Sequence, residues 1–317
     1  MKSRLILNPV SGTDAAPDYL QTINERLRDR VGDLDIAMTV AGGDAERLAE
    51  SSARDGYDTL FVAGGDGTLN EVVNGVAKVP GGFEQVTFGL VPLGTGNDFA
   101  DALGLPEDVS AAVDILLAGR TIQADVGRLN DRYFINVSVG GFIAEVSDAV
   151  NPQLKSVAGK LAYLIGGAQV LMDYEPAHAQ VTIAKDGGAS DALTLDVQMF
   201  AVCNSRMVGG GRLIAPHAVI DDGVFDVCII KTMPTLEFLS LLTTVSSGDH
   251  IEDERVEYFR TRELTLRFNR PIKVNTDGEV LEADECHYRL LPRAARFLAG
   301  SAPYSAAAQQ QAPDAKA

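Results

Sequence analysis

The residues best suited to chemistry form one glycine-rich run, Gly64-Gly65-Asp66-Gly67-Thr68-Leu69-Asn70-Glu71. The run follows the strand-like segment Thr59–Ala63 and opens a segment of helical character, so we expect a strand-to-helix turn. Glycines let backbone N–H groups approach a phosphate, and a helix N-terminus adds a favourable dipole. The Asp66 carboxylate can then reach a Mg²⁺ ion that bridges phosphate oxygens, and the Thr68 hydroxyl can donate to a phosphate. The alternative is an ordinary turn whose aspartate caps the helix.

Two more glycine-rich loops follow predicted strands. Pro92-Leu93-Gly94-Thr95-Gly96-Asn97-Asp98 comes after the segment Phe88–Val91, and Asn8-Pro9-Val10-Ser11-Gly12 comes after Leu5–Leu7. Since the carboxyl ends of parallel strands share one sheet edge, we expect the three loops to converge on one polyanionic ligand. The chain has no Gly-x-Gly-x-x-Gly sequence, and its only Gly-Lys pair, Gly159-Lys160, is followed by leucine. Neither a dinucleotide fingerprint nor a Walker A loop is therefore present.

Two acidic turns can supply the other groups that phosphate chemistry needs. Asp277-Gly278-Glu279 places two carboxylates two positions apart, and a carboxylate within hydrogen-bond reach can accept a proton from a hydroxyl. Asp221-Asp222-Gly223 offers the oxygen ligands that Mg²⁺ prefers, with carbonyls of the turn as further ligands. On residue type alone, the default interpretation is a hairpin turn for the first and a plain turn for the second. The histidines and cysteines form no metal or nucleophile pattern; they are His178, His217, His250, His287, Cys203, Cys228 and Cys286.

Strands and helices alternate through about the first 120 residues, which predicts a parallel, doubly wound α/β sheet. After Asp125 the pattern predicts a mostly antiparallel, β-rich second domain. The expected strands there are Tyr133–Val139, Gln180–Ala184, Leu193–Ala201, Phe225–Ile230 and Leu264–Phe268, and the expected helices are Lys155–Met172 and Thr235–Val245. We expect domains at 1–125 and 126–293, a return to the first domain at 294–300, and a disordered, low-complexity tail at 301–317.

The charge of the chain limits its partners. Its 317 residues carry a net charge of -17, and 6% of them are aromatic, with no Trp, which argues against a nucleic-acid partner. Residues 1–125 hold 9 basic and 20 acidic residues, a net of -11, whereas 126–298 hold 17 and 23, a net of -6. Within the second part, Arg255–Lys273 is locally basic and is a candidate contact for anionic lipid. Without a signal-like or membrane-spanning segment, we expect a cytoplasmic protein, peripheral to the membrane.

The motifs together resemble the diacylglycerol kinase catalytic domain family, in its bacterial soluble lipid kinase branch, which is related to sphingosine and ceramide kinases. The resemblance covers nearly all of the first 290 residues, in order. Besides the three glycine-rich loops and the two acidic turns, the matching motifs are Tyr133-Phe134-Ile135-Asn136, Gly140-Gly141-Phe142, Gly159-Lys160-Leu161-Ala162-Tyr163 and Gly209-Gly210-Gly211 to Ala215-Pro216.

The resemblance implies an ATP-dependent lipid kinase that phosphorylates a primary hydroxyl, with diacylglycerol converted to phosphatidic acid as the first expectation. It assigns the nucleotide to the first domain, and lipid and catalysis to the second. The implied nucleotide-binding residues are Thr39, Gly65, Asp66, Gly67, Thr68, Leu69, Asn70, Glu71 and Thr95. The implied Mg²⁺ ligands are Asp222 and the carbonyls of Val219 and Val224. Glu279 is the implied general base, with Asp277, Asp66 and Lys160 at the same site and Asp98 and Asp125 in an acidic network around it.

Two other functions stay open at this point. An NAD kinase-like enzyme would share the Gly-Gly-Asp-Gly-Thr loop, although the loop at 8–12 and the turn at 277–279 favour the lipid branch. A non-catalytic nucleotide or lipid sensor could use the same fold, although the intact Asp66 and Glu279 speak against it. The expected partner is a lipid substrate, met by peripheral membrane contact and with an acyl cleft lined by the helix at 155–172. A homodimer is an open alternative to a monomer.

Overall fold

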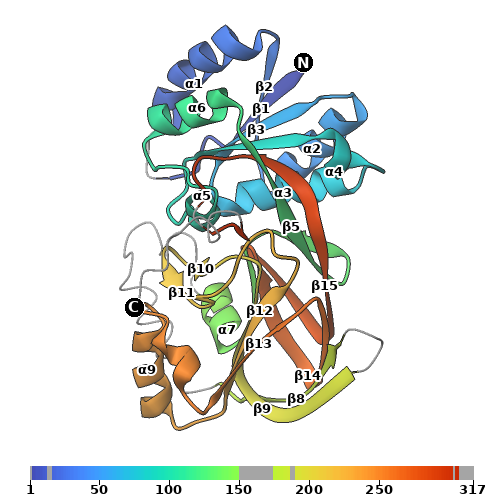
Figure 1. The fold of residues 1–317 in the computed structure, drawn as a ribbon, viewed down its shortest axis with the longest axis vertical. Helices are drawn as coiled ribbons and strands as arrows, with labels where there is room; N and C mark the ends of the chain where they lie inside the picture. Colours follow the sequence, from blue (N-terminus) through green and yellow to red (C-terminus); the bar gives the residue numbers. More distant parts are fainter. Residues whose placement is uncertain (1, 13–15, 150–173, 186–189, 303, 307–317) are drawn as a thin grey trace.

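The computed structural model describes residues 2–12, 16–149, 174–185, 190–302 and 304–306. Helices gather around a sheet in the first half of the chain, whereas the second half consists mainly of strands (Figure 1). The predicted α/β fold with a β-rich second half is thus confirmed.

The first half is built on a parallel sheet in the order β4-β3-β1-β2. Its strands are β1 (Ser3–Leu7), β2 (Leu34–Met38), β3 (Thr59–Gly64) and β4 (Thr87–Pro92). Helices α1 (Ala16–Val31) and α6 (Val109–Ala118) lie on one face, and α2 (Asp44–Arg54), α3 (Asp66–Ala77) and α4 (Gly82–Gln85) lie on the other (Figure 1). All six residues of β3 are buried because helices cover both faces of the sheet, which explains the apolar run at residues 60–63.

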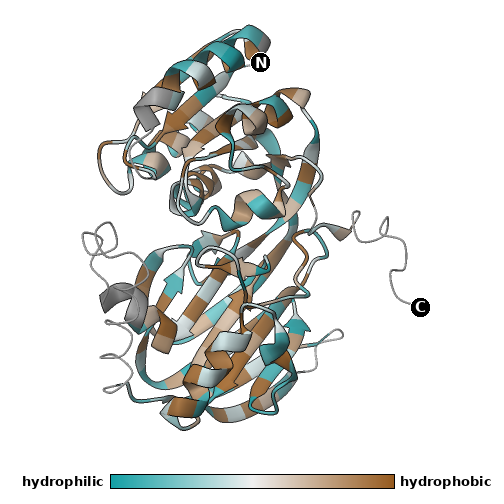
Figure 2. Cartoon of the chain, turned by 90° about the vertical axis from the view of Figure 1, so that its left-hand side faces the viewer, coloured by the Kyte–Doolittle hydropathy of each residue, from teal (hydrophilic) through white to brown (hydrophobic). Residues whose placement is uncertain are grey.

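The second half is folded mainly from antiparallel strand pairs. Its elements are β5 (Thr121–Leu129), β6 (Arg132–Phe134), β7 (Val137–Gly141), α7 (Phe142–Ala149), β8 (Ala177–Ala184), β9 (Ser190–Cys203), β10 (Met207–Val208), β11 (Arg212–Leu213), β12 (Phe225–Lys231), α9 (Thr235–Thr244), a 3₁₀ turn at Asp249–Glu252, β13 (Val256–Thr261) and β14 (Glu263–Thr276). Buried and exposed residues alternate through the first six positions of β8, as expected of a strand with one solvated face. Figure 2 shows the same mixture of hydrophobic and hydrophilic residues along the strands of this half.

One long strand, β15 (Glu279–Leu298), joins the two halves. It pairs antiparallel with β14 and β5, and its end at Arg296 and Phe297 pairs in parallel with β4. Thirteen of the described strands therefore form one continuous sheet, in which β15 lies between β14 and β4 (Figure 1), and β10 and β11 form a separate two-stranded sheet. An irregularity in the pairing with β5 falls between Leu291 and Ala295, where Arg293 has a positive φ of 49°.

Two expectations from the sequence need correction. The segment Tyr133–Val139 is not one strand, because the N–H groups of residues 135–137 bond the Asp277 carboxylate instead of a neighbouring strand. The tail does not begin at 301, because the Ile220 N–H donates to the Tyr304 carbonyl at 2.9 Å and the Arg206 guanidinium lies 4.3 Å from the Tyr304 ring. Residues 307–317 and the expected helix at 155–172 lie outside the described residues.

The locally basic stretch Arg255–Lys273 is not a free basic surface. Four of its six basic residues form ion pairs with carboxylates: Arg255 with Asp253 and Glu237, Arg260 with Asp222 and Asp226, Arg267 with Glu285, and Lys273 with Glu145. Its charge is therefore largely neutralised within the fold, which removes the reason to expect lipid binding there. No helix in the described ranges is long and apolar enough to cross a membrane.

Candidate functional site

The three glycine-rich loops meet at the carboxyl ends of β1, β3 and β4. In chain order, the first loop is 8–12, the second is 64–71 and the third is 92–98. The Asn8 side chain donates to the Thr68 hydroxyl at 3.0 Å, which links the first loop to the second. A Cβ on Gly94 would lie 2.5 Å from the Gly65 Cα, and one on Gly12 would lie 2.5 Å from the Leu93 carbonyl oxygen. Side chains are excluded from both places, so the backbones touch. The predicted convergence of the loops is confirmed.

Asp66 opens α3 but does not cap it. Its carboxylate oxygens accept the N–H groups of Asp98 at 3.0 Å and Phe99 at 3.1 Å, at the start of the short helix α5 (Asp98–Ala102). The N-terminus of α3 has no side-chain cap, so the alternative of an ordinary capped turn is wrong. Burial raises the pKa of Asp66, and the neighbouring Asp98 charge raises it further against the effect of the N–H donors. This carboxylate therefore favours a nearby positive charge.

The loop at 209–211, which we did not expect at the site, is bound by the Asp98 carboxylate. The two oxygens of this carboxylate accept the N–H groups of Gly210 at 3.0 Å and Gly211 at 2.8 Å. Residues 209–211 all have positive φ angles, a conformation that glycine adopts without strain. The run of three glycines was the signal in the sequence, but nothing in its spacing indicated that Asp98 was its partner.

The acidic turn at 277–279 lies against the second glycine-rich loop. A Cβ on Gly67 would lie 3.9 Å from the Asp277 carbonyl oxygen. The Asp277 carboxylate accepts three N–H groups, from Ile135 at 2.7 Å, Asn136 at 3.1 Å and Val137 at 2.8 Å. Burial, with a contribution from the Asp66 charge, outweighs the three donors and raises the pKa of Asp277 to about 7. Asp277 is thus a buried anchor of the turn, at the point where the two halves meet.

Glu279, the next carboxylate of this turn, is more accessible. Its side chain is 42% exposed, and both of its oxygens accept bonds from the Arg132 guanidinium, at 2.5 and 2.6 Å. An ionised carboxylate has about four lone-pair positions, so two bonds leave room for a further donor. The position of Glu279 is therefore compatible with accepting a proton from a substrate.

The predicted Mg²⁺ ligands lie around Asp125, in the second half. Asp222 accepts the Val224 N–H at 3.2 Å, and its other oxygen pairs with the Arg260 guanidinium at 2.5 Å. Asp125 is fully buried and accepts the N–H groups of Gly223 and Arg293, at 2.7 and 2.6 Å. Burial raises the pKa of Asp125 to about 6, with a contribution from neighbouring carboxylates. The region is rich in carboxylate and carbonyl oxygens, and the Arg260 guanidinium compensates part of its negative charge.

Some of the other expected nucleotide-binding residues are buried and others are exposed. Thr39 is buried directly after β2, with its N–H donating to the Leu7 carbonyl at 2.9 Å. Glu71 accepts the Ala45 N–H at 3.2 Å, at the start of α2, whereas Thr95 is exposed. Leu69 and Asn70 are buried, and the Leu69 N–H already donates to the Gly65 carbonyl. Lys160 lies outside the described residues.

The loops at 8–12 and 92–98 border an open hollow of about 270 Å³, and the loop at 64–71 does not line it. Its lining includes Ser11 and Gly12 of the first loop, Gly94, Thr95 and Asn97 of the third, and Tyr19 of α1. Across the part of the chain that the structure describes, no three His, Cys, Asp or Glu residues form a group suited to a metal. A site made of one carboxylate and backbone carbonyls would not be such a group.

Comparison with known proteins matches both halves of the chain. Residues 2–129 match the model "Diacylglycerol kinase catalytic domain", and residues 136–299 match "YegS C-terminal NAD kinase beta sandwich-like domain". A diacylglycerol kinase of Bacillus subtilis is 34% identical over 279 residues, which are 88% of this chain and 89% of that protein. A diacylglycerol kinase of Staphylococcus carnosus is 33% identical over 278 residues, which are 88% of each chain. A crystal structure of a putative diacylglycerol kinase from Bacillus anthracis superposes with a TM-score of 0.79 and 25% identity, covering 95% of this chain and 96% of that one. The chain belongs to the diacylglycerol kinase catalytic domain family, with a YegS-type C-terminal domain.

Proposed function

We propose that this chain is a lipid kinase that transfers the γ-phosphoryl group of ATP to a primary hydroxyl, with diacylglycerol as the acceptor and phosphatidic acid as the product. One observation supports this most directly: the backbone of Gly67, at the start of α3, lies against the turn that carries Glu279. Phosphoryl transfer needs a held phosphate chain, compensation of its charge and a group that accepts the proton of the hydroxyl. The glycine-rich loops suit the first need, and Glu279 suits the last.

In this proposal the phosphates lie at the meeting point of the three loops. Backbone N–H groups at 65–68 and the N-terminus of α3 face the anion, and Thr95 contacts the nucleotide from the third loop. Glu279 accepts the proton of the attacking hydroxyl, and Asp277 fixes the turn without touching the substrate. Thr39 and Glu71 contribute at the nucleotide end, and Lys160 is retained as a proposed site residue.

Two places on the chain suit Mg²⁺ by their chemistry. Asp66 is partly buried beside Asp98, with a raised pKa, and its oxygens fit a cation that arrives with the nucleotide. Asp222, with the carbonyls of Val219 and Val224, fits a second ion, because the neighbouring carboxylates of Asp125 and Asp226 add negative charge there. Bound Mg²⁺ would neutralise phosphate charge at the first place and stabilise the turn at the second. Arg260 already pairs with Asp222, so it would compete with a cation at the second place.

The proposed membrane contact and cellular location follow from the proposed lipid acceptor, diacylglycerol. A diacylglycerol substrate resides in a membrane, so a kinase that acts on it must touch that membrane at least transiently. We keep a cytoplasmic, peripherally membrane-associated protein as part of the proposal, and a homodimer as an open alternative.

A kinase assay on mixed micelles tests this function. Label transfer from ATP is measured to diacylglycerol, to sphingosine, to ceramide and to NAD, with Mg²⁺ present and then chelated. We expect transfer to diacylglycerol that is lost on chelation. Labelling of NAD alone would replace the proposal with an NAD kinase, and labelling of no acceptor would favour the sensor.

The general base is tested with Glu279→Gln. The amide keeps the shape of the side chain but cannot take a proton, so turnover should fall at least about 100-fold while ATP binding, followed by calorimetry, persists. Glu282→Gln, at an exposed carboxylate of the same strand, is the matched control and should keep full activity. A fully active Glu279→Gln enzyme would refute the assignment.

A further inference from the structure

Both carboxylates of the acidic turn are held by one short segment, residues 132–137. The backbone of this segment holds Asp277 with three N–H groups, and its first side chain, Arg132, holds Glu279. One guanidinium nitrogen, Nη2, reaches both Glu279 oxygens, at 2.5 and 2.6 Å. A charge-assisted bond of this kind is stronger than one between neutral groups, so it holds the carboxylate close to the guanidinium.

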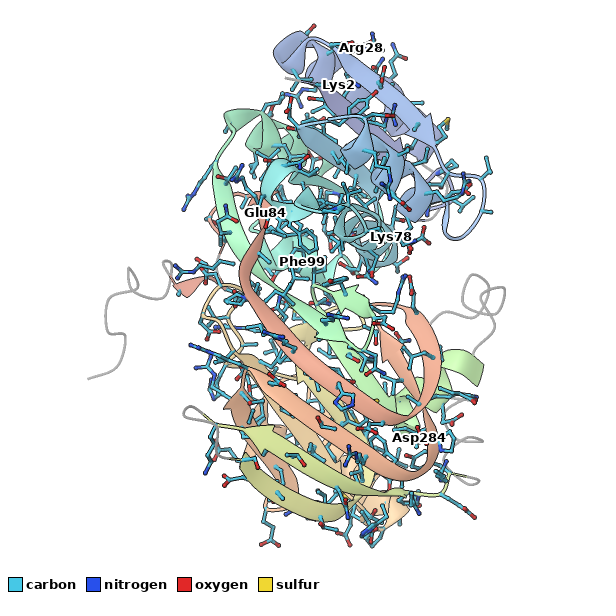
Figure 3. The ribbon with its side chains drawn as sticks, turned by 90° about the vertical axis from the view of Figure 1, so that its right-hand side faces the viewer. Lys2, Arg28, Lys78, Glu84, Phe99 and Asp284 are labelled. Carbon is cyan, nitrogen blue, oxygen red and sulfur yellow. The ribbon has the colours of Figure 1, made fainter. Side chains whose placement is uncertain are left out.

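The other end of the Arg132 guanidinium is anchored in the first half of the chain. Its Nη1 donates to Glu46 of α2 at 3.0 Å, and the second oxygen of Glu46 pairs with Lys78, directly after α3, at 2.5 Å. Burial alone would raise the pKa of Glu46, but the bonds from Lys78 and Arg132 outweigh it and hold the pKa below its usual value. Lys78 is labelled in Figure 3, on the side of the first half that faces the second. The anchor of Arg132 is therefore charged and itself held in place.

The backbone beside Arg132 is also docked onto α3. The Tyr133 N–H donates to the Asn74 side-chain oxygen, and the Asn74 amide donates to the Tyr133 carbonyl, both at 2.9 Å. Helices α2 and α3 pack so closely that a Cβ on Gly75 would lie 2.2 Å from the Glu46 carbonyl oxygen. The position of Arg132 thus follows that of α3, the helix whose N-terminus forms part of the proposed phosphate site.

We propose that Arg132 is a positioning residue that aligns Glu279 with the nucleotide-binding half of the chain. The inference rests on the proposed function, because it gives Glu279 its role. A glutamate that is 42% exposed would otherwise sample several rotamers, and a displacement of about 1 Å can cost roughly 100-fold in rate. Arg132 occupies two of the acceptor positions of Glu279 and leaves the others for a substrate hydroxyl.

The first test separates kcat from KM in the lipid kinase assay. Arg132→Ala should lower kcat about 10- to 100-fold while the KM for ATP changes less than about twofold, since the phosphate site is untouched. Arg132→Lys should recover only part of the loss, because one ammonium cannot span Glu46 and Glu279 as the planar guanidinium does. Arg128→Ala is the matched control, because Arg128 pairs with the exposed Asp131 in the same hairpin and should leave kcat unchanged. An unchanged kcat in Arg132→Ala would overturn the proposal.

A second measurement does not depend on activity. Hydrogen–deuterium exchange of residues 276–281 should become faster in Arg132→Ala and stay at the wild-type rate in Arg128→Ala. If the wild-type chain phosphorylates no lipid, the proposed function fails, and this measurement still decides whether Arg132 holds the turn. Unchanged exchange in Arg132→Ala would overturn the positioning role, whatever the activity.

Discussion

Replacing Asp277 by asparagine should change how the stability of the chain depends on pH. The Asp277 side chain is buried, and it accepts three backbone N–H groups in a turn at the boundary of the two halves. Burial raises its pKa to about 7 from an ordinary 3.8. An asparagine has nearly the same size but cannot titrate, so the substitution removes one proton equilibrium from the folded state.

The sign and size of the effect follow from linkage. Because the pKa is higher in the folded than in the unfolded chain, the folded chain binds the proton more tightly between about pH 4 and pH 7. The stabilisation from Asp277 is therefore complete below about pH 4 and is lost as the pH rises through about 7. At about 1.36 kcal/mol per pH unit, the gap between the two pKa values corresponds to at most about 4 kcal/mol. Asp125, whose pKa is about 6, changes the stability with pH in the same direction. It is present in both the wild type and the variant, so its contribution cancels in the difference between them.

Urea unfolding of the wild type and of Asp277→Asn, followed by circular dichroism from pH 4.5 to pH 8, measures this difference. We expect the stability advantage of the wild type over the variant to shrink by about 2–4 kcal/mol as the pH rises through this range. Asp284→Asn, at an exposed carboxylate far from the site (Figure 3), should show no such change. An advantage that stays constant with pH, or that grows, would refute the assignment of a raised pKa to Asp277.

Two glycine substitutions test the close approaches around the site. Gly75→Ala places a methyl group 2.2 Å from the Glu46 carbonyl oxygen, so α2 and α3 must separate, and we expect a loss of about 1–3 kcal/mol in the free energy of unfolding, measured in urea. A variant as stable as the wild type would contradict this packing. Gly94→Ala pushes the third loop away from Gly65, and we expect ATP affinity, measured by calorimetry, to fall at least tenfold, about 1.4 kcal/mol. Unchanged affinity would remove the third loop from the proposed phosphate site.

Local sequence signals predicted the parts of the site that depend on the course of the backbone. A strand followed by a glycine-rich loop and a helix is a local pattern, and the parallel sheet then brings the ends of β1, β3 and β4 together. The convergence of the three loops could therefore be predicted. The presence of a turn at each place was also predictable, since Asp277-Gly278 and Asp222-Gly223 are common turn sequences.

The partners of the charged side chains could not be predicted in this way. Arg132 and Glu279 are 147 positions apart, and Asp98 and Gly210 are 112 apart, so no spacing along the chain connects them. Each pair depends on how β6 and the loop at 209–211 pack against the first half, which is a tertiary property. The packing of Tyr304 could not be predicted either. It depends on contact between the Tyr304 ring and the distant Arg206 side chain, which the low-complexity composition of the tail does not indicate.

The course of β15 has a consequence for how the chain is made. During synthesis, the first four strands of the sheet leave the ribosome long before Arg296 and Phe297, which pair with β4. Until then β4 presents an open strand edge, the kind of surface on which other chains can add strands. The contacts that close this edge join residues more than 200 positions apart, and contacts of such long range are expected to form slowly. The sheet of the first half is therefore completed by residues from near the end of the chain, so this half does not have all of its strands until β15 has been made.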